Sequence, residues 1–125
     1  MSRLMSDQTI TSLIEKLEGG PVYLTHKEAY DLAVALGSDV ALSLANTIRK
    51  AFAGKSLDAA LALAERVGVR PYQADASIKG KWSWMVVDEA RLGDLEANPY
   101  ARATAATPAL ALCAAILRAQ SEARV

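Results

Sequence analysis

The sequence predicts a single α+β domain over residues 1–125, with a small antiparallel sheet covered by helices and a helical hairpin inserted at residues 21–55. Alanine supplies 25 of the 125 residues and aromatic residues only 6%, which favours helices packed closely through small side chains. The segment KWSWMVVD (81–88) alternates in the manner of a half-buried strand. The segment PALALCAAIL (108–117) is apolar on every side, so a helix there must be covered from several directions.

Two helices are predicted before residue 37. Apolar residues recur at helical spacing over residues 10–18, and the pair Gly19–Gly20 ends that helix. Thr25 and Glu28 have the spacing of a capping box, in which each side chain satisfies a free backbone N–H at a helix start. The second helix is therefore expected over residues 26–36, ending at Gly37.

Two more helices follow. Ser38 or Asp39 can cap a helix whose apolar stripe continues to Phe52, before Gly54. Ser56 then caps the segment LDAALALAERV, which Gly68 ends. Because residues 26–53 form two successive helices, a DNA-binding helix-turn-helix is an alternative to an ordinary αα-hairpin. The second helix begins DVALSLAN, which has few side chains able to read base edges, and this favours the hairpin.

The strands are expected in the second half of the chain. Residues 69–80 give mixed signals, and we predict a loop there with room for an edge strand. Trp82, Trp84 and Val86 share one face of the predicted strand at 81–88. YARATA, from Tyr100, predicts a second strand antiparallel to the first, because the connection is too short for a helical crossover.

The last helix is expected to start at Thr107, with Pro108 in its first turn. Its ten apolar residues are about half of what a bilayer requires, so we expect no membrane span. A second copy of the chain could supply the cover that such a helix needs, which suggests a homodimer. The side chains proposed for this self-association are Leu110, Leu112, Ile116 and Leu117.

The succession SLDAALALAERV, GKWSWMVVD, YARATA and TPALALCAAILRA resembles a group of small, mostly uncharacterised proteins encoded by phages and prophages. The opening ITSLIEKLEGG is also similar to theirs, and the resemblance covers about residues 8–20 and 56–121. It implies helices layered on a small antiparallel sheet, the phage ABA sandwich domain. Residues 23–52 depart from the family pattern, and the family supplies no catalytic residues to transfer.

The two tryptophans allow two interpretations. Both indoles can pack beneath the helices at 57–67 and 108–120, as large aromatic side chains usually do in a small core. Alternatively, they form a stacking platform flanked by Lys79 and Lys81 that holds single-stranded nucleic acid. The absence of a wider basic patch favours the core.

The sequence shows no set of residues for catalysis, a cofactor or a metal. His26 is the only histidine, and Cys113 lies within the apolar helix with no basic partner nearby. Asp88 and Glu89 would point to opposite faces of a strand. Neither a glycine-rich phosphate loop nor a Gly-x-Ser-x-Gly motif is present.

These observations favour a non-enzymatic module that binds a host or phage protein, and the resemblance suggests an inhibitor of a host defence system such as CRISPR. The alternative is a small nucleic-acid-binding module, for which Lys79, Lys81, Arg70 and Arg102 would have to converge on one face. The 14 basic and 14 acidic residues are balanced along the chain, so nucleic acid is the less favoured partner. The lone cysteine, with Asp7 and Gln8 interrupting any apolar leader, predicts a cytoplasmic protein.

Overall fold

Three antiparallel strands form one sheet in the order β1-β2-β3 in the computed structural model, which describes residues 7–36, 41–78, 81–89 and 99–123. The strands are β1 (Arg70–Ile78), β2 (Lys81–Val87) and β3 (Tyr100–Ala105). The helices are α1 (Asp7–Gly19), α2 (His26–Ala35), α3 (Ala41–Phe52), α4 (Leu57–Val67) and α5 (Pro108–Ala123). The predicted α+β class is confirmed.

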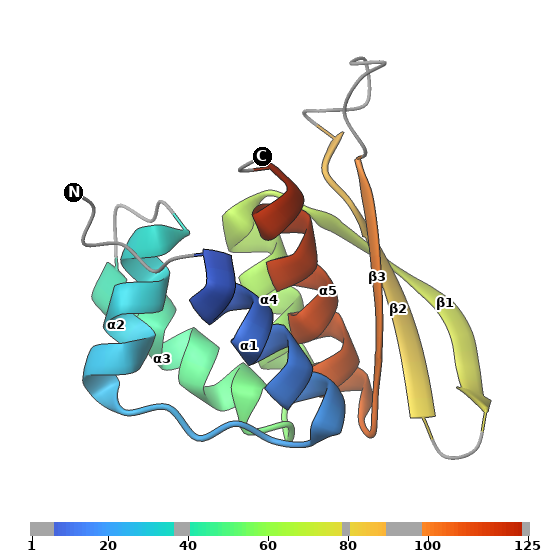
Figure 1. Cartoon of the computed structure of the whole chain (residues 1–125), viewed down its shortest axis with the longest axis horizontal. Helices are drawn as coiled ribbons and strands as arrows, with labels where there is room; N and C mark the ends of the chain where they lie inside the picture. The colour runs from blue at the N-terminus through green and yellow to red at the C-terminus, as the bar shows by residue number, and fades with distance from the viewer. Residues whose placement is uncertain (1–6, 37–40, 79–80, 90–98, 124–125) are drawn as a thin grey trace.

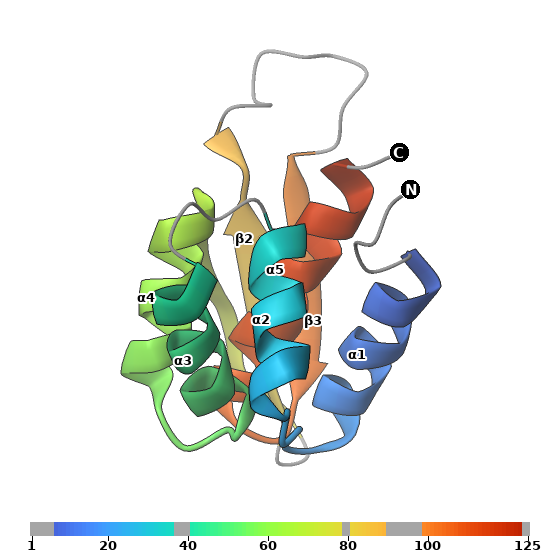
Figure 2. The same cartoon turned by 90° about the vertical axis from the view of Figure 1, so that its left-hand side faces the viewer.

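The helices lie on one side of the sheet (Figure 1). Helix α5 packs directly on β2 and β3, α1 lies beside it and reaches β3, and α4 reaches β1. Helices α2 and α3 pack against each other farther from the sheet, and α3 joins them to α4 and α5 (Figure 2). No described element packs on the opposite face of the sheet, so the helices cover the sheet on one side only.

Helix α5 is the centre of this arrangement. It contacts α1, α3, α4, β2 and β3, so other elements of the same chain bury its apolar surface. Every residue from Ala109 to Leu117 is buried. The four side chains predicted for self-association are each 0–1% exposed: Leu110, Leu112, Ile116 and Leu117. They fill the core and present no surface to a second copy. The apolar surface of this helix is therefore no longer an argument for a homodimer.

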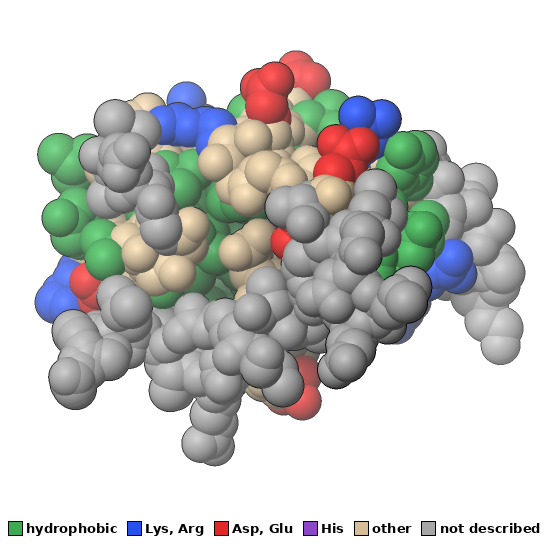
Figure 3. Space-filling view, turned by 90° about the horizontal axis from the view of Figure 1, so that it is seen from above, with side chains coloured by type: hydrophobic (Ala, Val, Ile, Leu, Met, Phe, Trp, Pro, Cys, Tyr) green, Lys and Arg blue, Asp and Glu red, His purple; other side chains and the backbone are tan. Residues whose placement is uncertain are grey.

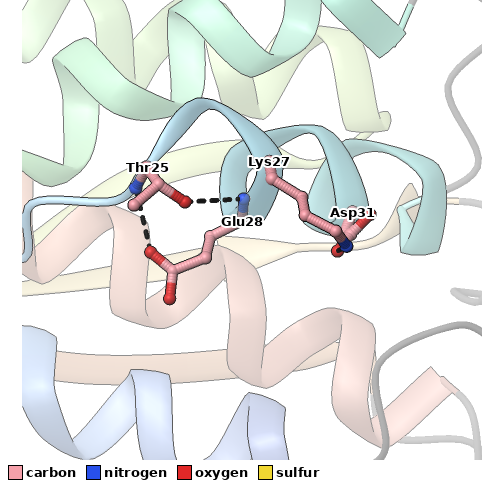
Figure 4. Close-up of polar contacts among 4 residues, drawn as sticks. All are labelled: Thr25, Lys27, Glu28 and Asp31. Atoms are coloured by element: carbon pink, nitrogen blue, oxygen red, sulfur yellow. Dashed lines mark hydrogen bonds and ion pairs between the residues drawn. The ribbon is translucent and has the colours of Figure 1, made fainter.

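The helix starts agree with their capping signals. The Thr25 hydroxyl accepts the Glu28 N–H at 3.1 Å, and the Glu28 carboxylate accepts the Thr25 N–H at 2.9 Å (Figure 4). Ser56 accepts the Ala59 N–H at 3.0 Å to start α4, and Thr107 accepts the Leu110 N–H at 3.2 Å to start α5. The predicted signals at Gly37, Ser38 and Asp39 lie outside the described residues.

The predicted helical hairpin is present as α2 and α3, and it shares the core of the rest of the domain. Its buried side chains belong to the same apolar cluster as those of α1, α4, α5 and the sheet. The chain entering it is fixed where the Val22 N–H donates to the Phe52 carbonyl at 2.8 Å. Gly54, at a φ of +83°, then lets the chain turn closely against Leu110 of α5.

For residues 69–80 the sequence predicts a loop with room for an edge strand, and the structure has the nine-residue edge strand β1 over most of this segment. Its pairing with β2 shifts register between Gln73 and Asp75 and again between Asp75 and Ile78. Each irregularity interrupts the alternation of faces by which a strand is recognised in sequence. Pro71 adds a further signal against a strand, although an edge strand tolerates proline.

Candidate functional site: the open face of the sheet

Strand alternation divides the sheet into two faces. Trp84, Val86 and their β3 partners Ala103 and Ala101 face α5 and are buried. Trp82 is half-buried and packs against the same core. The prediction that both tryptophans belong to the covered face is therefore confirmed. The Trp84 Nε1–H has no hydrogen-bond partner within the described part of the chain, so packing holds this indole in place.

The opposite side, which we call the open face, carries the side chains that alternate with these. Its described members are Arg70, Tyr72, Lys81, Ser83, Met85, Val87, Tyr100, Arg102 and Thr104. Two neighbouring rows cross all three strands. One row is Arg70, Val87 and Tyr100, and the next is Tyr72, Met85 and Arg102.

Apolar and aromatic groups form the middle of the open face. Tyr72 and Tyr100 keep 45% and 48% of their surfaces exposed, although they stand in regular strands. Between them, Val87 is buried but does not belong to the core cluster beneath the sheet. Its register partners Arg70 and Tyr100 are placed to cover it. The open face thus has a shallow apolar layer of its own.

Among the described side chains of the open face, the charged groups are basic, and one of them is paired. The Arg70 guanidinium lies 2.8 Å from the carboxylate of Glu89, just beyond β2. A hydrogen bond with the Tyr72 side chain, together with the negative charge of Glu89, raises the pKa of Arg70 above its usual value. Within the described ranges, Arg102 makes no ion pair through its exposed side chain. With respect to the described residues, Arg102 therefore presents an unpaired cation next to Met85.

Each edge of the sheet has a feature that hinders the addition of a further strand. Arg118 of α5 donates to the Arg102 carbonyl at 2.7 Å, occupying an acceptor on the outer edge of β3. The same guanidinium pairs with Glu18 of α1, with N–O distances of 3.2 and 3.4 Å. On the other edge, Pro71 and the two register shifts interrupt the ladder of β1. These features favour the face of the sheet over its edges as the place where a partner binds.

The structure places three of the four predicted basic residues on one face but does not cluster them, because Arg70 pairs with Val87 at one end of β2 and Lys81 lies at the other end. Arg70, Lys81 and Arg102 are exposed on the open face, while Lys79 lies outside the described residues. Figure 3, which shows the molecule from above, has Lys and Arg groups in separate patches with Asp and Glu groups among the described side chains. Sequence reasoning misses Tyr72 because it predicts neither the bounds nor the register of the edge strand that carries this residue. Tyr100 could have been found from the alternation of YARATA.

Other possible chemistry receives little support from the described residues. No group of three metal-ligating side chains occurs among them, and none of their helices is long and apolar enough to cross a membrane. A pocket of about 420 Å³ beside the open face contains Glu65 and the Arg70–Glu89 ion pair. Burial raises the pKa of the Cys113 thiol far above its usual range, which keeps it protonated at neutral pH.

In comparisons with known proteins, no family model, no curated protein and no solved structure matches the chain. A function must therefore be argued from the geometry of the open face itself.

Proposed function

We propose that the protein is a non-enzymatic module that binds one protein partner through the open face of its sheet. The supporting observation is the juxtaposition of Tyr72, Met85, Tyr100 and Arg102 on a face that no described element covers. Tyrosine, methionine and arginine are the side chains enriched in protein–protein interfaces, and tyrosine and arginine supply many of the binding hot spots.

The size of the face sets the expected strength of binding. Three strands at a spacing of about 4.8 Å, with about 3.4 Å per residue, give a face of roughly 14 by 20 Å. This flat area is well below the roughly 800 Å² per partner of a standard stable interface. Binding through the open face alone is therefore expected to be weak and transient.

The partner that we propose is a host protein, with inhibition of a defence system such as CRISPR as the specific role. The resemblance to phage-encoded proteins motivates this choice of partner. The near-neutral sequence, with pI about 6.6, is compatible with a protein partner because it carries no strong overall positive charge.

The test is affinity purification of the tagged full chain from bacterial lysate after chemical cross-linking, which retains a weakly bound partner, with and without nuclease and with matched variants. Tyr72→Ser and Arg102→Ser should each release the partner. Tyr30→Ser should retain it, because Tyr30 has a similar exposure of 42% but lies on α2. Circular dichroism of each variant checks that the fold is intact. If Tyr72→Ser and Arg102→Ser both retain the partner at wild-type levels, the open face is not the binding surface.

Single-stranded nucleic acid is a second candidate partner, favoured by the placement of Arg70, Lys81 and Arg102 on the same face as two exposed tyrosines. Bases stack on aromatic side chains, and nearby cations contact the phosphates. A labelled oligonucleotide titrated at two salt concentrations tests this candidate. Binding that weakens at higher salt and is lost in Tyr72→Ser would support nucleic acid, whereas no salt-sensitive binding would eliminate it.

A further inference from the structure

A second concave surface lies on the side of the molecule away from the sheet, where the chain entering α2 passes the end of α3 (Figure 1). This pocket has a volume of about 310 Å³ and is lined by Tyr23, Leu24, Arg49, Lys50 and Ala53. Its size is at the lower end of the range for small-molecule sites. None of its residues belongs to the open face.

Arg49 is held in position at this pocket by a backbone carbonyl and by the ring of His26. Its Nε–H donates to the Leu24 carbonyl at 3.1 Å, and Nη1 lies 3.2 Å from both ring nitrogens of His26. Because a guanidinium has five N–H donors, these contacts orient the group and leave further donors for a ligand. A pre-oriented arginine loses less conformational freedom on binding than a mobile one.

The carboxylates of the neighbouring helix α2 are engaged with their own helix. Glu28 accepts the Thr25 N–H in the capping box, and Asp31 pairs with Lys27 at 2.8 Å (Figure 4). In the part of the chain that the structure describes, Arg49 has no carboxylate partner. With Lys50 next to it, the pocket carries a local excess of positive charge in a protein whose formal net charge is zero.

The rim adds a flat apolar surface. Tyr23 keeps 71% of its surface exposed, a large fraction for an aromatic side chain, and it lines the pocket together with Leu24 and Ala53. A cation beside an exposed ring suits a ligand that joins an oxyanion to a planar group, because the ring stacks and the guanidinium binds the anion. We propose that this pocket binds such a ligand, an aromatic phosphate or carboxylate, independently of the open face.

The test titrates phenyl phosphate, benzoate, inorganic phosphate and benzyl alcohol into the full chain while amide chemical shifts are recorded by NMR. Saturable shifts at Tyr23, Lys50 and Ala53 are expected with phenyl phosphate or benzoate, and comparison of the two distinguishes the source of the oxyanion. Benzyl alcohol, which lacks the anion, should produce none. No saturable shift with either aromatic anion would overturn the proposal.

Variants separate the two contacts. Arg49→Gln should weaken binding about tenfold or more, since hydrogen bonds to charged groups are involved. Tyr23→Ala, at a largely exposed side chain, should bind phenyl phosphate no better than inorganic phosphate. Lys27→Gln removes the same charge outside the pocket and should bind as the wild type does. Equal binding by wild type and Arg49→Gln, or equal losses in Arg49→Gln and Lys27→Gln, would contradict a specific site.

Discussion

Gly54→Ala tests how the hairpin is joined to the core. Gly54 has a φ of +83°, and a Cβ atom built on it would lie 3.0 Å from Cγ of Leu110 and 3.1 and 3.2 Å from its two Cδ atoms. Leu110 is 1% exposed within α5, so its side chain would have to shift inside the buried core to make room. The substitution therefore combines backbone strain with overpacking.

Gly68 supplies a matched control with nearly the same backbone conformation. Its φ is +86°, but a Cβ atom there would meet nothing within 4 Å. Gly68→Ala should therefore cost only the left-handed strain of an L-residue, about 1–2 kcal/mol. Gly54→Ala should add about 1–3 kcal/mol from overpacking, for a total of about 2–5 kcal/mol.

Urea unfolding followed by circular dichroism measures both free energies of unfolding. In a Leu110→Ala background the extra cost of Gly54→Ala should disappear, because the clashing methyl groups are gone. Equal destabilisation by Gly54→Ala and Gly68→Ala would refute the close approach of the chain to α5. So would an extra cost that persists in the Leu110→Ala background.

The remaining predictions concern a cap, a thiol and an ion pair. Thr25→Ala should lower the free energy of unfolding by about 1 kcal/mol, measured by urea titration, because the α2 cap is lost. Burial raises the pKa of Cys113 in the folded protein, so the thiol ionises first in the unfolded state. The free energy of unfolding should therefore be independent of this thiol below a pH of about 8.5, the pKa of the unfolded thiol, and should decline above that pH. Urea titrations at a series of pH values measure this effect. In the alkaline range, the free energy of unfolding of the wild type should fall by up to about 1.4 kcal/mol per pH unit more than that of Cys113→Ala. The same pH dependence in both proteins would contradict the prediction. A double-mutant cycle of Arg118→Met and Glu18→Gln should give a coupling near 1 kcal/mol, since both side chains are only about one-third exposed; no coupling would argue against the link between α1 and α5.

Local signals in the sequence determined the helices. The capping residues Thr25, Ser56 and Thr107 each accept a backbone N–H three residues ahead, so these local signals place the helix starts. The alternation of Trp82 and Trp84 likewise identified the strand β2 and its covered face.

Tertiary structure decided which surfaces are available. That β1 exists, that helices cover only one face of the sheet, and that Arg118 reaches the Arg102 carbonyl all depend on contacts between chain segments. The orientation of Arg49 by the Leu24 carbonyl is of the same kind, since the two residues are 25 positions apart in the sequence. Residue periodicity reports which side of an element is apolar, but it cannot report what lies against that side. Cover and exposure arise only when distant segments pack together, and for that reason the open face and the Arg49 pocket could not be predicted from the sequence.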